Sequence, residues 1–106
     1  MRVVFKSERL EEIYKQGAEV GKSRYGKEVI KAFIRKIDIL AAVANSVELA
    51  KFKSLHLETL KKEERYKGMH SIRVNDQYRI IFKLTKEKDG TETIEIAEIH
   101  DLTDYH

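Results

Sequence analysis

Apolar side chains recur at helical spacing through the second quarter of the chain, and this is the clearest pattern in the sequence. They stand three or four residues apart at Ile30, Phe33, Ile34, Ile37, Leu40, Ala41 and Ala44. Such a stripe is typical of an amphipathic helix that buries one face, so we predict a helix over roughly residues 27–44. The opposite face presents the cations Lys27, Lys31, Arg35 and Lys36. Asn45 and Ser46 then fit as the C-cap of this helix and the N-cap of a short helical turn at residues 47–50.

The residues before the long helix predict a short strand followed by a short helix. Residues 2–6 alternate in polarity, as a half-buried strand does. Ser7 is a suitable N-cap for the helix, and Gly17 is a suitable end. That helix would carry three apolar residues at helical spacing, Leu10, Ile13 and Tyr14. Glycines then punctuate the connection to the long helix.

From residue 69 onward the apolar positions alternate, which predicts strands. His70, Ile72 and Val74 share one side, and after a break the pattern continues with Tyr78, Ile80, Phe82 and Leu84. The break is a hairpin turn. A two-residue loop would place Ile72 beside Arg79 and mix apolar and charged faces, so parity favours a three-residue loop, Asn75–Gln77, or an equivalent bulge. That register pairs Ile72 with Ile80 and sets Arg73 beside Arg79, a like-charge pair that costs energy unless an anion lies between them.

A further turn at Asp89 and Gly90 is followed by a strand that carries Ile94 and Ile96. The order of strand, helices and antiparallel meander predicts an α+β fold. In it, an N-terminal strand and two to three helices pack on one face of a small antiparallel β-sheet. The sequence has no repeat or low-complexity tract, and its 106 residues suit one core, so we expect a single domain over residues 1–106.

The composition excludes several classes of protein and of functional site. The chain has no Cys, which excludes disulfides, thiolate metal sites and thiol catalysis, and which fits a reducing cytoplasm. Neither a signal-like N-terminus nor an apolar run of the ~20 residues that span a bilayer is present, so we expect a soluble cytoplasmic protein with no membrane partner. No metal-binding motif or glycine-rich phosphate loop occurs, and we therefore expect no metal and no cofactor.

The charges are unevenly distributed, although the formal net charge is only +3. Basic residues outnumber acidic ones over residues 22–36 and again over residues 61–67, whereas acidic residues collect from residue 92 onward. Lys and Arg gain from neutralising phosphates and releasing counterions, so this polarity favours an anionic partner on one surface. The alternative is that these residues form ordinary solvated helix faces.

Two motifs carry a family resemblance. Residues 70–80 read HSIRVNDQYRI, and the last three residues of the sequence are Asp104, Tyr105 and His106. Both resemble recurring features of the HigB, or plasmid maintenance killer, family of toxins. With residues 55–61 and the preceding amphipathic helices, the resemblance covers nearly all of the chain.

The resemblance implies a RelE/ParE-like fold and a type II toxin-antitoxin system. Members of the family look like ribosome-dependent endoribonucleases, which cut mRNA and inhibit translation. Each is held inactive by a tightly bound antitoxin, usually a HigA-like helix-turn-helix repressor through which the complex binds operator DNA. The implied partners are therefore this antitoxin, the ribosome and mRNA.

Metal-free RNA cleavage uses the neighbouring 2'-hydroxyl as nucleophile and needs a base, cations for the developing charge, and an acid for the leaving oxygen. His56 is our first candidate base, because imidazole is the side chain that titrates near neutral pH and because the alternation in residues 55–57 points it away from the apolar side. His106 is a second candidate base or acid. Tyr105 would stack on a base or donate a proton, and Asp104 would orient an imidazole or a cation.

Arg79 and Arg73 would grip the scissile phosphate from adjacent strands, and Arg79 is the better candidate because its guanidinium can contact two phosphate oxygens at once. We expect three further cations to hold the RNA backbone rather than take part in chemistry, and these are Lys61, Arg65 and Lys67. The simpler interpretation of all these cations is a solvated surface. We expect His70 to be a structural residue at the edge of the core. We also expect His100 and Asp101 to be structural, since adjacent residues of a strand face opposite ways.

Two other functions remain open. A toxin of the same fold could instead bind and poison a topoisomerase, as the ParE relatives do, or the chain could be an inert nucleic-acid-binding module. His56 and the Asp-Tyr-His terminus favour the nuclease, because an inhibitor needs no titratable groups facing solvent.

Overall fold

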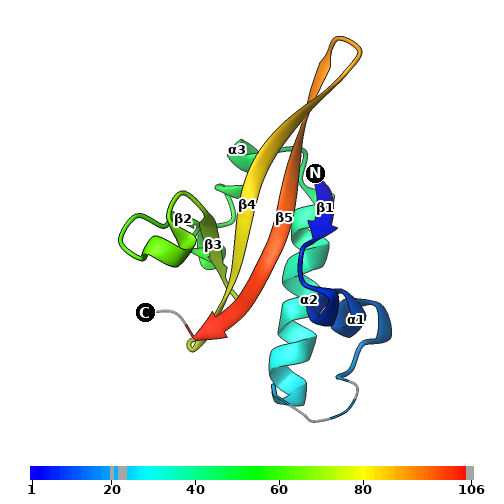
Figure 1. The fold of residues 1–106 in the computed structure, drawn as a ribbon, viewed down its shortest axis with the longest axis vertical. Helices are drawn as coiled ribbons and strands as arrows, with labels where there is room; N and C mark the ends of the chain where they lie inside the picture. Colours follow the sequence, from blue (N-terminus) through cyan, green and yellow to red (C-terminus); the bar gives the residue numbers. More distant parts are fainter. Residues whose placement is uncertain (20, 22–23, 105–106) are drawn as a thin grey trace.

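The computed structural model describes residues 1–19, 21 and 24–104. Along the chain it contains β1 (Arg2–Phe5), α1 (Glu8–Gln16), α2 (Lys27–Ala42), α3 (Ser46–Leu49), β2 (Glu58–Thr59), β3 (His70–Arg73), β4 (Tyr78–Asp89) and β5 (Glu92–Asp104). Two short 3-10 turns, η1 (Lys53–Leu55) and η2 (Glu64–Tyr66), flank β2. Figure 1 shows a long, twisted β4–β5 ribbon with α1 and α2 along one side of it. The α+β fold class predicted from the sequence is confirmed.

The five strands form one mixed sheet in the order β1-β5-β4-β3-β2. Strands β3, β4 and β5 pair antiparallel, as the predicted meander requires, and β2, which the sequence did not predict, pairs antiparallel with β3. Strand β1 pairs parallel with β5, with Arg2 opposite Ile96 and Phe5 opposite Ile99. The helices between β1 and the meander give the chain enough length for such a parallel crossover. The N-terminal strand is therefore one edge of the sheet, beside β5.

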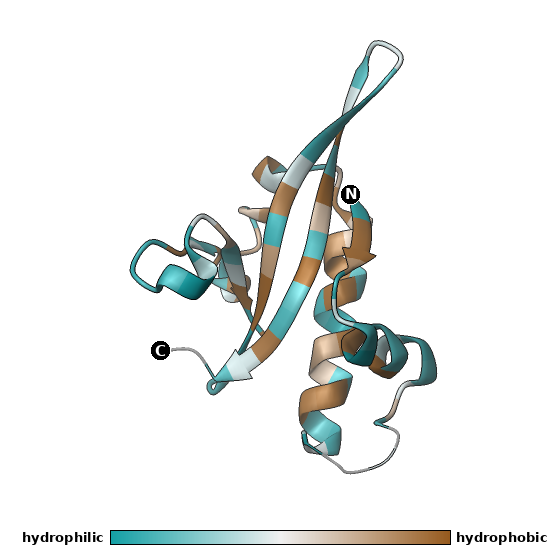
Figure 2. Cartoon of the chain, viewed as in Figure 1, coloured by the Kyte–Doolittle hydropathy of each residue, from teal (hydrophilic) through white to brown (hydrophobic). Residues whose placement is uncertain are grey.

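The main core lies between α2 and the covered face of the sheet. Fully or nearly fully buried side chains of α2 are Ile30, Phe33, Ile37 and Leu40, and those of the sheet are Ile72, Ile80, Phe82, Ile99 and Leu102. The predicted stripe is thus the buried face of α2, and Lys27, Lys31 and Arg35 are exposed on its other side. Figure 2 shows brown, hydrophobic positions recurring along α2 and through the middle of the sheet. Among the described helices, none is long and apolar enough to span a membrane.

The predicted ends of α1 are confirmed. The Ser7 hydroxyl accepts a hydrogen bond from the Leu10 amide at 3.2 Å, and Gly17 adopts a left-handed conformation with φ 71°. The predicted boundary after the long helix is wrong by one to two residues. Helix α2 ends at Ala42 with Val43 as its C-cap, and Asn45 is the N-cap of α3, because its side-chain oxygen accepts from the Glu48 amide at 2.9 Å.

The hairpin between β3 and β4 has the register that parity predicted. The Val74 amide donates to the Tyr78 carbonyl at 2.9 Å, which leaves a three-residue loop. Within that loop the Asn75 side-chain oxygen accepts from the amides of Gln77 at 2.9 Å and Tyr78 at 2.7 Å. Beyond Phe82 the ribbon of β4 and β5 has no pairing with β3, and Figure 2 shows that its projecting end is largely hydrophilic.

Candidate functional site

The face of the sheet opposite the helices carries the two strand arginines that the sequence singled out, Arg73 and Arg79, and we call it the distal face. Its residues follow from the strand register, because side chains alternate between the two faces of a strand. One row across the strands contains Glu58, Ser71, Ile81 and Asp101, and the next contains Arg73, Arg79 and Thr103. The two arginines are therefore cross-strand neighbours, as predicted.

Arg79 lies at the centre of the distal face and is held by the protein on several sides. Its Nε donates to the Ser71 hydroxyl at 2.8 Å, and its Nη2 donates to the His56 carbonyl and, at 3.4 Å, to the Ser71 carbonyl. The Glu58 carboxylate lies 3.9 Å from Nη2. Only 13% of the Arg79 side chain is exposed, whereas Glu58 is exposed. The guanidinium therefore joins β4, β3 and the segment that leads into β2.

His56 is exposed at the end of the η1 turn, between the buried Leu55 and the partly buried Leu57. The two leucines pack into the core on the helix side. The backbone of His56 is left-handed, with φ 45°, rather than extended, so a turn and not strand alternation directs its side chain to solvent. The structure thus brings two predicted site residues together, because Arg79 contacts His56 directly through its carbonyl.

Arg73 has a different environment from Arg79. Its Nη2 pairs with the carboxylate of Asp76, whose side chain is 94% exposed, and its Nε donates to the Asn75 carbonyl at 3.3 Å. Both partners lie in the hairpin loop. The Arg73 side chain is itself 39% exposed, so this cation faces solvent beside Arg79.

Residues 60–69 fold over part of the distal face, and we call them the basic loop. Leu60, Tyr66 and Met69 pack on Ile81 and form a small second hydrophobic cluster. The loop is closed by two backbone hydrogen bonds, from Leu60 to Met69 at 2.8 Å and from Gly68 to Leu60 at 2.9 Å. The predicted RNA-binding residues Lys61, Arg65 and Lys67 are all exposed on it.

A tyrosine and an aspartate fasten the basic loop to β5. The Tyr66 hydroxyl donates to Asp101, and the Arg65 guanidinium lies 3.8 Å from the same carboxylate and 5.1 Å from the Tyr66 ring centre. Burial, the hydrogen bond to Asp101 and the charge of that carboxylate raise the pKa of Tyr66 to about 12. The hydroxyl therefore stays protonated, and remains a hydrogen-bond donor to Asp101, throughout the physiological pH range.

The C-terminal candidates are only partly described. Asp104 pairs with Tyr78 in the sheet register, next to the Arg79–Thr103 pair, and its carboxylate accepts from the Gln77 side chain at 3.3 Å. By alternation Asp104 lies on the helix side of the sheet, one residue beyond the row that contains Arg79. Tyr105 and His106 lie outside the described residues.

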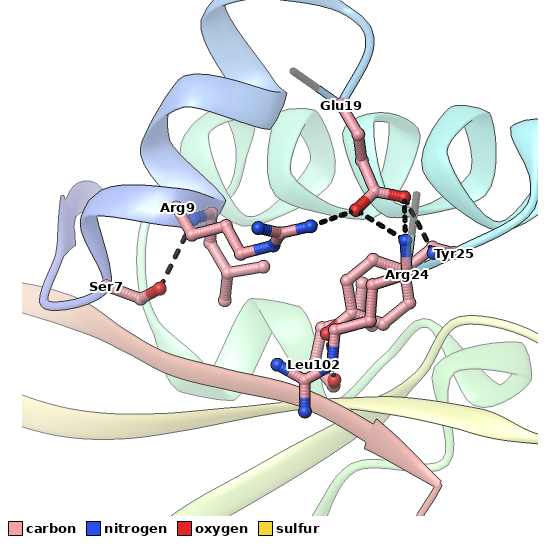
Figure 3. A network of polar contacts seen from close by, with 7 residues as sticks. Ser7, Arg9, Glu19, Arg24, Tyr25 and Leu102 are labelled. Atoms are coloured by element: carbon pink, nitrogen blue, oxygen red, sulfur yellow. Dashed lines mark hydrogen bonds and ion pairs between the residues drawn. The ribbon is translucent and has the colours of Figure 1, made fainter. Parts of the chain in front are cut away.

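The end of β5 is held in place from the helix side. The hydroxyl of the buried Tyr25 donates to the Leu102 carbonyl at 2.8 Å. Figure 3 shows the Glu19 carboxylate receiving hydrogen bonds from Arg9 at 2.6 Å and from the backbone amides of Arg24 and Tyr25 at 3.0 and 2.6 Å. Burial opposes ionisation of Glu19, but these donors outweigh it and hold the pKa below its ordinary value. This network anchors Tyr25, and through Leu102 it holds the end of β5, where Thr103 pairs with Arg79.

A family model for the HigB-like toxin, described as a RelE-like toxin of the type II toxin-antitoxin system HigB, matches residues 3–104. The chain belongs to this HigB-like toxin family. A type II toxin has a cognate antitoxin, so an antitoxin is a partner of this protein. The resemblance predicted from residues 70–80 and 104–106 is confirmed at the level of the family.

A solved structure supports the same fold for this toxin. The YoeB/ParE toxin from Agrobacterium tumefaciens superposes with a TM-score of 0.53 over 100% of both chains, at 15% sequence identity. At that identity the likeness establishes the RelE/ParE-like fold alone. Among curated proteins none matches this chain.

The toxin's two other histidines are not part of the distal-face cluster around Arg79. His70 is partly buried, its Nδ1 lies 3.1 Å from the Thr59 hydroxyl, and its ring centre lies 5.9 Å from that of Phe82. Burial lowers the pKa of His70, as expected for a structural histidine at the core edge. His100 lies at an irregularity in the pairing of β4 with β5, and its buried Nε2 has no hydrogen-bond partner among the described residues.

Four residues that organise the toxin's distal face were missed by sequence reasoning or assigned a lesser role, and these are Glu58, Ser71, Tyr66 and Asp101. Ser71 alternates with His70 and Ile72 in the predicted strand, so its place beside Arg79 followed from the register. No signal in the sequence pairs Tyr66 with Asp101, because the contact depends on how the basic loop returns to the sheet.

Proposed function

We propose that this toxin is a ribosome-dependent mRNA endoribonuclease, a metal-independent mRNA interferase that inhibits translation. The observation that supports this most is the cluster on the distal face, where Arg79 donates to the backbone carbonyl of the exposed His56 and pairs across the strands with Arg73. The cluster is flanked by the exposed cations of the basic loop. A titratable side chain beside cations on an open surface is the arrangement that cleavage of a phosphodiester requires.

In the proposed reaction the 2'-hydroxyl of one nucleotide attacks the adjacent phosphorus. A base, for which His56 is the first candidate, removes the hydroxyl proton as the new P–O bond forms. The bond to the 5'-oxygen breaks, and an acid protonates that oxygen, leaving a 2',3'-cyclic phosphate and a 5'-hydroxyl. Arg73 and Arg79 supply positive charge around the phosphorane, and Asp104, Tyr105 and His106 remain proposed as the group that supplies the acid or orients it.

The basic loop would bind the rest of the RNA. Lys61, Arg65 and Lys67 reach solvent from a loop that Tyr66 fastens to the sheet. Phosphate contacts of this kind position a strand without reading its sequence, and they weaken as salt rises. We propose that these cations hold the mRNA backbone while the His56 region carries the chemistry.

The partners follow from the same proposal. The toxin would act in the cytoplasm on ribosomes that carry mRNA. Its antitoxin would be a HigA-like helix-turn-helix protein, through which the complex binds operator DNA. Purifying the toxin with the product of the adjacent reading frame tests this, because a neighbouring product that neither binds the toxin nor restores growth contradicts it.

Induction in cells tests the nuclease. The wild type and a His56→Ala, His106→Ala double variant are induced, and the 5' ends of transcripts are mapped before and after induction. A Lys15→Ala variant, altered on the exposed side of α1, is the matched control. We expect new mRNA ends for the wild type and the control, and none for the double variant.

Two results would contradict the proposal. Arrested growth without new mRNA ends in the wild type would favour the ParE-like alternative, in which the toxin poisons a topoisomerase. Retained cleavage by the double variant would show that neither histidine is required.

A further inference from the structure

The exposed face of α2 carries cations on three successive turns, at Lys27, Lys31 and Arg35, and we call these three residues the α2 stripe. They stand four residues apart, which places them along one side of the helix over ~12 Å. Lys31 lies 3.9 Å from the Glu28 carboxylate, which is 89% exposed. Lys27 and Arg35 form no ion pair with any residue that the structure describes. The stripe therefore presents positive charge that the protein does little to neutralise.

The stability of α2 does not explain the stripe. Like charges four residues apart repel each other and destabilise a helix, and the stripe contains two such pairs. The helix dipole favours anions at the N-terminus and cations at the C-terminus. Glu28 follows this rule, but Lys27 at the start and Asp38 in the C-terminal half do not, and the last turn has no basic residue. Charges that break a local rule in this way are better explained by an anionic ligand than by the fold.

The stripe has the chemistry of a contact to a phosphate backbone. Lys and Arg bind phosphates and release counterions when they do so. Proteins that bind unpaired bases also need exposed rings on which those bases stack. The one aromatic residue of α2, Phe33, is completely buried, so this helix offers no such ring. A double-stranded RNA segment, which presents phosphates and keeps its bases stacked inside, therefore fits the stripe better than a single strand does.

The stripe and the distal face lie on opposite sides of the molecule. Helix α2 packs through Phe33 and Ile37 against one face of the sheet, and Arg73 and Arg79 lie on the other face. Figure 1 shows α2 along one side of the β4–β5 ribbon. One short stretch of RNA cannot contact both surfaces at once, so the ligand of the stripe is separate from the strand on the distal face.

We propose that the α2 stripe docks the toxin on a double-stranded segment of ribosomal RNA while the distal face holds the mRNA. This rests on the proposed function, which places the toxin on the ribosome. Two contacts with one particle make the second contact intramolecular, and this raises the overall affinity by about 10²–10⁴-fold where the geometry permits both. Dependence of cleavage on the ribosome then has a physical cause, because free mRNA engages the distal face alone.

Binding to ribosomes that carry no mRNA tests the stripe apart from the distal face. The stripe variant is Lys27→Gln, Lys31→Gln, Arg35→Gln, since glutamine has nearly the same helix propensity as Lys and Arg. We expect it to bind empty ribosomes at least about 10-fold more weakly than the wild type does. The slope of log affinity against log salt should fall by about 2–3, or about 1 for each lost phosphate contact. Affinity for a short single-stranded RNA should change by less than about twofold, because the distal face is intact.

A matched control loses the same charge from exposed lysines outside α2, and it is Lys51→Gln, Lys86→Gln, Lys88→Gln. It should bind empty ribosomes within about twofold of the wild type. A second control, Lys27→Arg with Lys31→Arg, keeps the charge and should keep the binding. If the stripe variant binds empty ribosomes as well as the first control does, the proposal is wrong. It is also wrong if the stripe variant loses affinity for single-stranded RNA by the same factor as for ribosomes.

Thermal unfolding separates docking from folding. Because the charges of the stripe repel each other, the stripe variant should have a Tm equal to or above that of the wild type. A lower Tm would mean that the cations serve the fold, which would overturn the proposal.

Single-turnover cleavage of mRNA on ribosomes separates docking from the nuclease. The stripe variant should need a higher ribosome concentration for half-saturation, with an unchanged maximal rate. If the wild type cuts no mRNA yet binds empty ribosomes through the stripe, the proposed function fails and the docking surface stands. If the wild type and the stripe variant cleave equally at every ribosome concentration, the nuclease stands and the docking surface is wrong.

Discussion

Replacing Tyr66 with phenylalanine removes a single hydroxyl, the one that donates to Asp101 and fastens the basic loop to β5. A hydrogen bond to a charged group contributes ~1.5–3 kcal/mol to stability. The Asp101 side chain is 25% exposed, so water partly replaces the lost donor and the cost should be near the lower bound. We therefore expect Tyr66→Phe to lower the free energy of unfolding by about 1.5 kcal/mol, or about 6 °C in Tm for a chain of this size.

The matched control is Tyr14→Phe. The Tyr14 hydroxyl also donates to an aspartate, Asp38, at 2.5 Å, but on the exposed side of the helices. A solvent-exposed bond of this kind contributes less, because water competes for both groups, and we expect a loss of less than about 0.5 kcal/mol. Urea unfolding of both variants and the wild type at pH 7 provides the comparison. If Tyr66→Phe is no less stable than Tyr14→Phe, the loop is not held by this bond.

The same bond predicts a pH dependence with a definite sign. The pKa of Tyr66 rises from its ordinary value near 10 to about 12 in the folded chain. Its contribution to stability is therefore fully present below pH 10 and is lost as the pH rises through about 12. The stability difference between wild type and Tyr66→Phe should shrink by about 1 kcal/mol between pH 10 and pH 11, since the other tyrosines titrate in both proteins. A difference that stays constant up to pH 11 would contradict the assigned cause of the shift.

Three further predictions concern the distal face and the core edge. Arg73→Ala should weaken binding to single-stranded RNA of every sequence and should reduce the slope of log affinity against log salt by about 1, as measured by fluorescence anisotropy; an unchanged slope would mean that Arg73 contacts no phosphate. Ser71→Ala should destabilise the fold by about 1–3 kcal/mol in urea, because it leaves the buried Nε of Arg79 without its acceptor, whereas Ser54→Ala at an exposed position should change it little. Burial lowers the pKa of His70, so the unfolded chain binds the proton more readily, and the wild type should lose stability as the pH falls below about 6.5. His70→Gln should lose less over the same range in Tm measurements at pH 7.5 and 5.5, and equal losses in both proteins would exclude His70 as the cause.

The elements that the sequence predicted best are those whose pattern is local. The stripe from Ile30 to Leu40 repeats at 3.6 residues, and only one face of a helix can bury it. The β3–β4 hairpin was predicted in its register because a slip of one residue would have put Arg79 opposite Ile72. In both cases a single short segment contains all the information that decides the structure.

The contacts that organise the candidate site were harder to predict because they join segments distant in sequence. Arg79 reaches His56 across 23 positions, and Tyr66 reaches Asp101 across 35. Strand β2 has only two residues, too few to show an alternation. The residue types at the site were foreseeable, but which donor meets which acceptor depends on the paths of two irregular segments, residues 50–57 and the basic loop.

The pairing of β5 shows most directly why a regular pattern does not suffice. Ala97 and Ile99 face the helix-side core, and strict alternation would put residues 101 and 103 there as well. Instead Leu102 is the next core residue, because the register shifts between the pairs Ile81–Asp101 and Phe82–Ile99 and leaves His100 as an extra residue. The bulge is therefore what turns Asp101 toward Tyr66 and Thr103 toward Arg79. Without it Leu102 would lie on the distal face and Asp101 in the core. Burying the Asp101 carboxylate and exposing the Leu102 side chain would both cost free energy. This explains why the chain accepts an irregular ladder at this point.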